Sequence, residues 1–224
     1  ELLERYPPVV WAFFFGLIIA SAVYIARQVT KWGMIGIGLL VFGAALAYAL
    51  TVLNPLSGST QPLLVFLAGA IAISALILPG ISGSFILVLL GMYTVVFPAI
   101  RGLLSGDTSQ FLTVFVFGLG CLAGLALFSR LLSYTFAKFP NQTLALLTGF
   151  MLGSLNKLWP WRNPISTRVN SSGEVVPVLE QKVMPADFIG DPYVLGVVLA
   201  FLAGLALVFL LEFLVKPSET SPGA

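Results

Sequence analysis

The sequence predicts an all-α polytopic membrane protein, a helical bundle with at least one re-entrant helical hairpin. Residues of the AVILMFWYC set make up 58% of the 224 residues, and only 9% are charged. An ordinary soluble domain has about 25% charged residues, so this chain has too few charges to cover a surface exposed to water. The longest uncharged stretch lies between Lys31 and Arg101. We therefore expect a single integral membrane domain over residues 1–224.

Four uncharged stretches are long enough to cross a membrane as helices. A crossing needs about 20 mostly apolar residues, and the stretches that meet this length are 9–26, 33–53, 111–129 and 193–215. The stretch 143–155 is short for a crossing; it is either re-entrant or the end of a helix that begins earlier, in 131–139. A polar loop, 160–192, precedes the last span, and its Asn-Ser-Ser-Gly at 170–173 predicts a turn between two short extended runs.

The apolar residues between the second and third spans are interrupted at Pro79 and Gly80. Proline biases the preceding residue away from helical geometry, and glycine favours a turn. Two half-helices are expected, 63–78 and 84–97, with Pro98 ending the second. At 1.5 Å per residue they are about 24 and 21 Å long, shorter than the ~30 Å hydrocarbon core. They form a re-entrant hairpin, two tilted crossings or one broken crossing.

Loop charges favour the first two geometries, which return the chain to the side from which it came. The loops 27–32 and 130–142 then lie on one side of the membrane and together carry four Lys and Arg residues. The loops 54–61 and 101–110 lie on the opposite side and together carry one. Because cytoplasmic loops collect Lys and Arg, Arg27 and Arg130 are expected on the cytoplasmic side. We assign residues 62–98 to a re-entrant hairpin.

The composition also excludes several kinds of chemistry. The chain has no histidine, which removes an imidazole base or metal ligand, and the single Cys121 gives no disulfide framework. A net charge of +2 is too small to indicate nucleic-acid binding. We expect no catalytic residue, no metal, no cofactor and no nucleic-acid partner.

The motif Leu-Pro-Gly-Ile-Ser-Gly-Ser-Phe at 78–85 is the best candidate for a ligand site. Irregular backbone at membrane depth is tolerated only where protein buries it or where it lines a wet cavity. Ser82 or Ser84 can cap the second half-helix, and Gly80 and Gly83 let a ligand approach the backbone. The amides and positive dipole end there suit an anion such as a phosphate. The residues alone leave open a plain Pro-Gly kink between packed helices.

Two enzyme classes share part of this motif. Intramembrane serine proteases have a G-x-S-G nucleophile motif, but a serine nucleophile needs a base beside it and this chain has no histidine. Bacitracin-resistance polyprenyl-diphosphate phosphatases have Pro-Gly-x-Ser-Arg-Ser-Gly. Here the arginine is absent and no span holds an acidic pair, so hydrolysis would lack its phosphate clamp and its acid or base. We therefore expect no enzymatic activity.

Three stretches of the sequence are distinctive when taken together. The first is Leu-Pro-Gly-Ile-Ser-Gly-Ser-Phe-Ile-Leu-Val-Leu-Leu-Gly-Met-Tyr at 78–93. The second is Phe-Gly-Leu-Gly-Cys-Leu-Ala-Gly at 117–124, running into Phe-Ser-Arg at 128–130. The third is Gly-Phe-Met-Leu-Gly-Ser-Leu-Asn-Lys-Leu-Trp-Pro-Trp at 149–161. In this order, over about residues 60–161, the chain resembles the bacterial and archaeal polyprenyl-phosphate transporter family.

The resemblance implies a multi-pass protein of the bacterial or archaeal cytoplasmic membrane. It further implies a flippase that returns undecaprenyl phosphate to the cytoplasmic leaflet, for reuse as a carrier in cell-envelope glycan synthesis. Members usually carry two Pro-Gly-x-Ser-Gly copies in halves that form an inverted repeat. Only the second copy is present here, so we expect that the N-terminal half-site is missing from this chain. The polyprenyl tail is expected to stay in lipid throughout.

Two cations are candidate ligands for the lipid phosphate. Arg130 and Lys157 each follow a glycine-rich stretch, and arginine offers a planar fork suited to phosphate oxygens. Ordinary anchors at the cytoplasmic edge are the alternative for both. The complete expected phosphate site is Pro79, Gly80, Ser82, Gly83, Ser84, Arg130 and Lys157. Two other functions use the same elements: a channel or carrier for a small soluble anion, and a membrane scaffold subunit that transports nothing.

Overall fold

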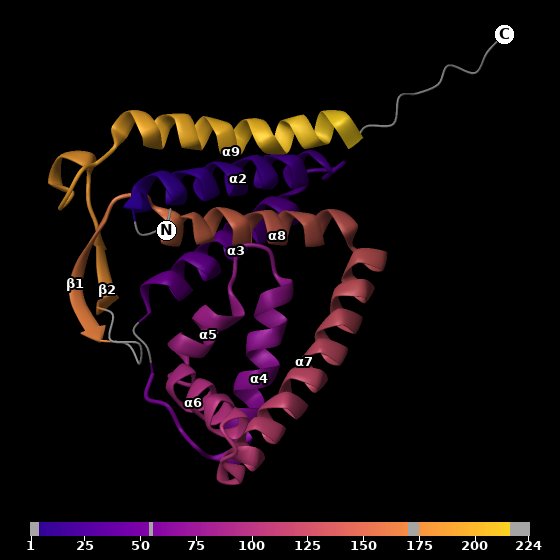
Figure 1. The fold of residues 1–224 in the computed structure, drawn as a ribbon. Helices are drawn as coiled ribbons and strands as arrows, with labels where there is room; N and C mark the ends of the chain where they lie inside the picture. Colours follow the sequence, from indigo (N-terminus) through magenta and orange to yellow (C-terminus); the bar gives the residue numbers. More distant parts are fainter. Residues whose placement is uncertain (1–4, 54–55, 170–174, 216–224) are drawn as a thin grey trace. The chain divides into compact units, whose positions relative to one another are not determined.

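The computed structural model describes residues 5–53, 56–169 and 175–215. They fall into two compact units: a terminal unit, Glu1–Tyr24 with Leu155–Ala224, and a central unit, Ile25–Ser154. Among the described residues, four helices are long and apolar enough to cross a membrane: Pro7–Arg27, Met34–Val52, Thr108–Lys138 and Val194–Leu214. These helices confirm the predicted class, an all-α polytopic membrane protein (Figure 1).

The terminal unit pairs two apolar helices in parallel, α2 (Pro7–Arg27) and α9 (Val194–Val215). The positions of Gly16 and Gly204 let the backbones touch, because a Cβ at either one would collide with a carbonyl of the other helix. Small residues at a helix crossing permit this close approach. Near the helix starts, the rings of Tyr6 and Tyr193 meet edge to face at 5.2 Å between centroids.

The rest of the terminal unit is the polar segment that was expected between the last two membrane helices. It begins with η2 (Leu155–Leu158) and forms an antiparallel hairpin of β1 (Arg162–Val169) and β2 (Val175–Lys182), followed by η3 (Pro185–Asp187). The two strands are the extended runs that the sequence predicted. The turn predicted at 170–173 lies outside the described residues.

The central unit contains two further parallel helix pairs. In the first, α3 (Met34–Val52) lies along α8 (Pro140–Ser154). A Cβ at Gly43 would meet the Leu146 carbonyl oxygen at 2.6 Å, and a Cβ at Gly149 would collide with the Leu40 carbonyl. The α3–α8 contact is therefore a backbone-to-backbone packing that larger residues would open.

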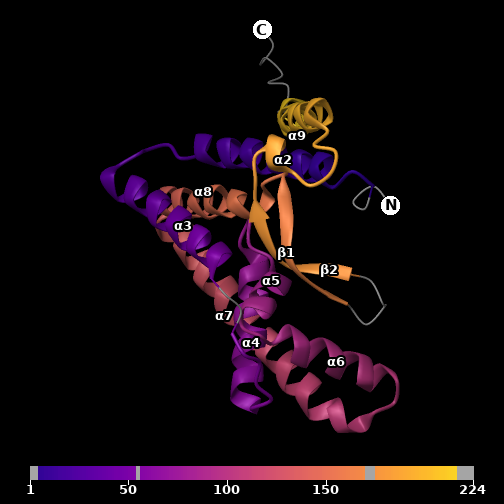
Figure 2. The same ribbon diagram turned by 90° about the vertical axis from the view of Figure 1, so that its left-hand side faces the viewer.

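The second pair joins α4 (Pro62–Ile77) to α7 (Phe111–Lys138). A Cβ at Gly69 of α4 would lie 2.5 Å from the Phe117 carbonyl oxygen, and a Cβ at Gly120 of α7 would collide with the Phe66 carbonyl. The first turn of α7 follows η1 (Thr108–Gln110), and α6 (Tyr93–Leu104) folds back against this end of α7 (Figure 2).

The structure corrects the expected loop at 130–142. α7 continues through Lys138, and α8 begins only two residues later, at Pro140. No glycine or proline interrupts residues 130–138, so nothing local ends the helix, while proline is favoured at a helix start. Arg130 therefore lies inside a helix and not in a loop. The short apolar stretch 143–155 belongs to a helix that starts at Pro140, and not in 131–139.

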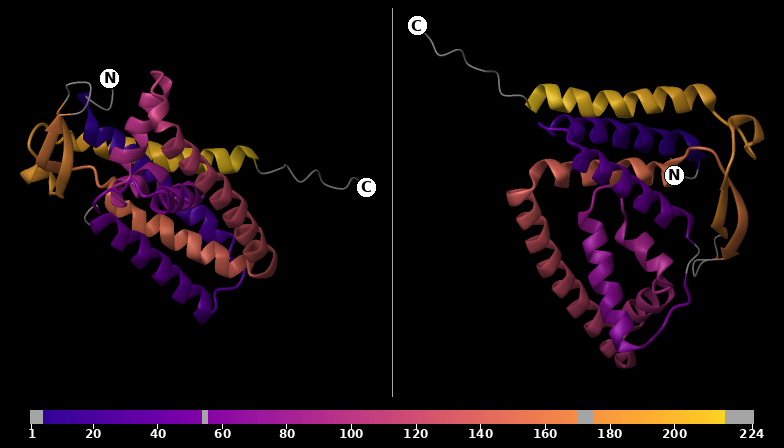
Figure 3. Two further views of the ribbon diagram at one scale, coloured as in Figure 1. Left: turned by 90° about the horizontal axis from the view of Figure 1, so that it is seen from below. Right: turned by 180° about the vertical axis from the view of Figure 1, so that it is seen from behind.

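α4 and α5 (Gly83–Leu89) form a helical hairpin whose two arms lie side by side (Figure 3, right). The expected second arm, 84–97, is wrong in length: the chain bends by 114° between α5 and α6. The break lies at Gly91, which has φ of +70° and whose backbone lies against the Leu56 carbonyl. Pro98 lies inside α6 and does not end it. The position of this hairpin relative to a bilayer stays a prediction.

Candidate functional site

The tip of the hairpin, residues 79–84, packs against the last turn of α8. Gly80 has φ of +88°, and a Cβ there would lie 2.7 Å from Ser154 Oγ and 3.1 Å from Met151 Cα. Three residues later, a Cβ at Gly83 would lie 2.6 Å from the Ala72 carbonyl oxygen of α4. Both glycines are therefore needed for the close packing of the tip, and Ser154 is a partner that the sequence did not reveal.

The two serines of the motif present their hydroxyl groups together. Ser82 Oγ and Ser84 Oγ lie 2.9 Å apart, and both residues are exposed. The expectation that Ser82 or Ser84 caps the second half-helix is not met: Ser82 is the N-cap residue of α5, but its side chain makes no capping hydrogen bond, and Ser84 lies inside the helix. A hydroxyl can rotate to donate to a new acceptor, so this pair can turn toward an anion.

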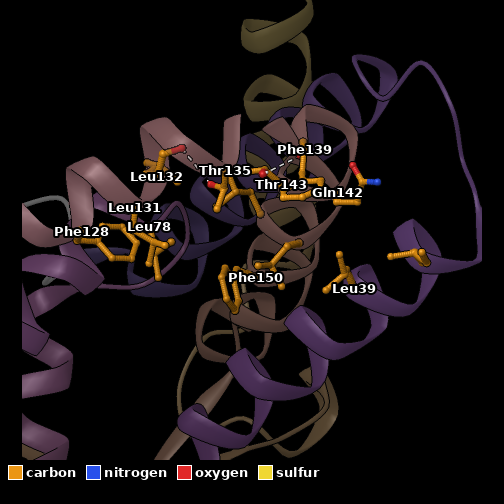
Figure 4. Close-up of a pocket in the computed structure, with 13 residues that line it drawn as sticks. Leu39, Leu78, Phe128, Leu131, Leu132, Thr135, Phe139, Gln142, Thr143 and Phe150 are labelled. Carbon is orange, nitrogen blue, oxygen red and sulfur yellow. Dashed lines mark hydrogen bonds between the residues drawn. The ribbon is translucent and has the colours of Figure 1, made fainter. Parts of the chain in front are cut away.

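An apolar pocket of about 520 Å³ lies beside the tip (Figure 4). It is lined by α3, α7, α8 and Leu78, the residue that precedes the Pro79-Gly80 turn. Leu78 and the tip residue Ile81 both pack on the buried cluster of Ala47, Leu147 and Phe150. The pocket and the tip thus share a wall.

The α7 side of the pocket is formed by Phe128, Leu131, Leu132 and Thr135, which share one face of that helix, and by Phe139, which directly follows its end. Their spacing of three and four residues is the helical repeat, and it continues the apolar pattern past Arg130. That pattern is the signal in the sequence for both the length of α7 and the pocket, and the prediction of a loop that begins at Arg130 does not use it.

Arg130 itself points elsewhere. It lies two residues after Phe128, which at about 100° per residue places it roughly 200° around the helix, on the side of α7 away from the pocket. The residue is exposed. Of the expected phosphate site, the structure thus brings together the tip residues, while Arg130 projects from the other face of a neighbouring helix.

Lys157 belongs to the terminal unit, in η2, where it joins a polar cluster with Arg162, Glu180 and Lys182. Arg162 donates from Nη1 to Glu180 Oε2 at 2.7 Å, and its guanidinium lies 4.5 Å from the centre of the Trp11 ring. Burial lowers the pKa of Lys157, and repulsion from Arg162 and Lys182 lowers it further, while Glu180 opposes the change.

The same influences act on the other cations of this cluster. Burial lowers the pKa of Arg162, opposed by Glu180, and burial followed by repulsion from Arg162 lowers the pKa of Lys182. Lys182 Nζ also donates to Asn156 Oδ1. Among the described residues, no group of three His, Cys, Asp or Glu side chains is arranged to hold a metal ion.

Comparison with known proteins gives the same family as the motifs. Residues 1–176 match a family model described as undecaprenyl phosphate translocase-like. A polyprenyl-phosphate transporter of Vibrio cholerae serotype O1 is 44% identical over 216 residues, covering 94% of this chain and 68% of the relative. A polyprenyl-phosphate transporter of Staphylococcus aureus is 32% identical over 160 residues, covering 66% of this chain and 56% of the relative. No solved structure matches.

The match covers the hairpin, the pocket and the helices that pack on them, and it confirms the resemblance seen in the sequence. The chain belongs to the undecaprenyl phosphate translocase-like family.

Proposed function

We propose that this chain carries polyprenyl phosphate from the outer to the cytoplasmic leaflet of the cytoplasmic membrane, with the hairpin tip binding the phosphate. Moving a phosphate through hydrocarbon is costly because its charge must leave water. The hydroxyls of Ser82 and Ser84, 2.9 Å apart at the tip, would replace part of that hydration. No bond is broken in this process, so the chain acts as a transporter and not as a phosphatase.

The observation that carries the proposal is the apolar pocket beside a polar tip in a chain of this family. A carrier for a small soluble anion needs a cavity lined by polar groups and closed to lipid. Here the lining is mostly apolar, and two of the lining residues, Ile35 and Leu131, are 70% and 55% exposed. An open pocket with apolar walls suits a lipid.

The test measures binding and transbilayer movement of a fluorescent polyprenyl phosphate in liposomes that contain the protein. The informative variant is Ser82→Ala with Ser84→Ala, which removes two hydroxyls and adds no bulk. Ser74→Ala is the matched control, because the Ser74 hydroxyl belongs to the same hairpin but donates to the Ala70 carbonyl of its own helix. Gly83→Leu is a poor choice, since its side chain would collide with α4.

A hydrogen bond to a charged group contributes about 1.5–3 kcal/mol, so the double variant is expected to bind at least tenfold more weakly, while Ser74→Ala binds normally. Equal binding by all three proteins would refute the phosphate site at the tip. Release of inorganic phosphate from a polyprenyl diphosphate would refute the assignment as a transporter without catalysis.

A further inference from the structure

We propose that the pocket between α3, α7 and α8 binds the isoprene units of the substrate nearest to the phosphate. This inference rests on the proposed function and assigns a second part of the substrate to a second part of the site. It replaces the expectation that the whole tail stays in lipid. The ligand proposed for the pocket is a methyl-branched polyprenyl chain.

The chemistry of the lining suits a neutral hydrocarbon. Thr135 and Thr143 are polar by composition, but each hydroxyl donates to a carbonyl of its own chain, of Leu132 and Phe139 respectively, both at 2.9 Å (Figure 4). Both threonine hydroxyls are therefore already bonded to the backbone. Gln142 is the third polar residue of the lining, and none of the described residues that line the pocket is charged. The pocket therefore offers no cation to a phosphate, and most of its wall suits a hydrocarbon.

The shape and size fit a short length of chain. Along α7 and the residue that follows it, the lining extends from Phe128 to Phe139, eleven steps along the chain or about 16 Å at 1.5 Å per step. If each non-hydrogen atom takes the ~30 Å³ that a water molecule takes in the liquid, a volume of 520 Å³ holds roughly 17 atoms. That corresponds to about three five-carbon units, so most of a long tail remains in the bilayer.

The position of the pocket fixes which units bind. Leu78 lines the pocket and is followed directly by the tip, and Leu78 and Ile81 rest on the same buried cluster. A lipid whose phosphate lies at Ser82 and Ser84 therefore has its first isoprene units beside Leu78. Because the bilayer is as apolar as the pocket, selectivity comes from packing and not from hydrophobic transfer. The pocket thus distinguishes a branched polyprenyl chain from the straight chains of phospholipids.

The experiment uses two photoreactive polyprenyl phosphates in phospholipid vesicles that contain the protein, followed by mass spectrometry of the labelled peptides. One probe carries its photoreactive group in the second isoprene unit, and the other carries it at the far end of the tail. Thr135→Trp fills the pocket from α7. Ser133→Trp is the matched control, since it adds the same bulk to the same helix at an exposed position roughly 140–150° around from the pocket face.

The first probe is expected to label residues 128–139 and 142–150, and the second probe is not. Thr135→Trp is expected to lower labelling by the first probe at least tenfold, while Ser133→Trp leaves it unchanged. Labelling spread over the lipid-facing surface, or equal labelling of both Trp variants, overturns the pocket assignment. Labelling that excess unlabelled polyprenyl phosphate does not reduce means that phospholipid fills the pocket, and it overturns the assignment too.

A third probe, the corresponding polyprenol without phosphate, separates this inference from the proposed function. If the polyprenol labels the pocket as strongly as the phosphate, the tail pocket stands and recognition of the phosphate fails. If labelling requires the phosphate but falls outside the pocket, the proposed function stands and the tail pocket fails. If neither compound labels the protein above the phospholipid background, both are wrong.

Discussion

Replacing Gly80 by alanine is expected to destabilise the central unit by about 2–6 kcal/mol, from two separate causes. A side chain at φ of +88° costs about 1–3 kcal/mol in backbone strain. The new Cβ would also lie 2.7 Å from Ser154 Oγ and 3.1 Å from Met151 Cα, and overpacking of a tight contact costs about 1–3 kcal/mol. The tip must then move away from α8.

Gly106 provides the control that separates the two causes. It has φ of +91°, and no described heavy atom lies within 4 Å of its Cβ position. Gly106→Ala therefore carries the strain without the collision, and it is expected to cost about 1–3 kcal/mol. The difference between the two variants measures the packing of the tip on α8.

The assay is unfolding by SDS in mixed micelles, followed by circular dichroism, in a double-mutant cycle with Ser154→Ala. Removing Ser154 Oγ takes away the nearest atom to the new Cβ, so Ser154→Ala is expected to recover about 1 kcal/mol in the Gly80→Ala background, a typical coupling for residues in contact. Equal losses for Gly80→Ala and Gly106→Ala, together with no coupling to Ser154, would show that the tip does not pack on α8 as described.

Three other predictions concern the helix contacts and the polar cluster. Gly149→Ala is expected to destabilise the central unit by about 1–3 kcal/mol because its Cβ would collide with α3. Gly118→Ala is the control: no described atom lies within 4 Å of its Cβ position, and it is expected to stabilise α7 by up to about 1 kcal/mol. The same SDS titration compares the two variants. Arg162→Ala is expected to cost about 2 kcal/mol because Glu180, 28% exposed, loses its partner, and adding Glu180→Ala should recover part of this loss in the unfolding free energy. The pKa of Lys157 in the folded state lies below the ordinary 10.5, so the unfolded state holds more protons, and stability rises with pH between the lowered pKa and 10.5. Thermal unfolding at several pH values should show a smaller rise in unfolding temperature for Lys157→Gln than for the unchanged protein. An equal rise in both proteins would contradict the lowered pKa of Lys157.

The interruption at Pro79 could be predicted from sequence because its cause is local. Proline and glycine act through their own backbone geometry, so the end of α4 is visible in the residues themselves. The break at Gly91 has a different cause. The chain turns there where its backbone meets the Leu56 carbonyl, 35 positions earlier, and no neighbouring residue reports such a contact.

The candidate site divides in the same way. The serines and glycines of the tip follow one another in the sequence, so the motif identified them together. Ser154, which packs on Gly80, is distant in the sequence and resembles any other serine at a helix end. Arg130 belongs to the expected site because cations often mark membrane edges, but that rule gives depth and not the direction in which a side chain points around its helix.

The burial of α8 has a consequence for how the chain enters a membrane during synthesis. Nine of its fifteen residues are buried, and at about 22 Å the helix is too short to span the hydrocarbon core by itself. Its first turns carry Asn141, Gln142 and Thr143, so insertion depends on docking against α3. Val52 and Pro140 are separated by about 90 residues, which a ribosome adds in about 5–20 s at 5–20 residues per second. During that interval the small-residue face of α3 is exposed to lipid, and any chaperone or insertase that shields it would act within this period.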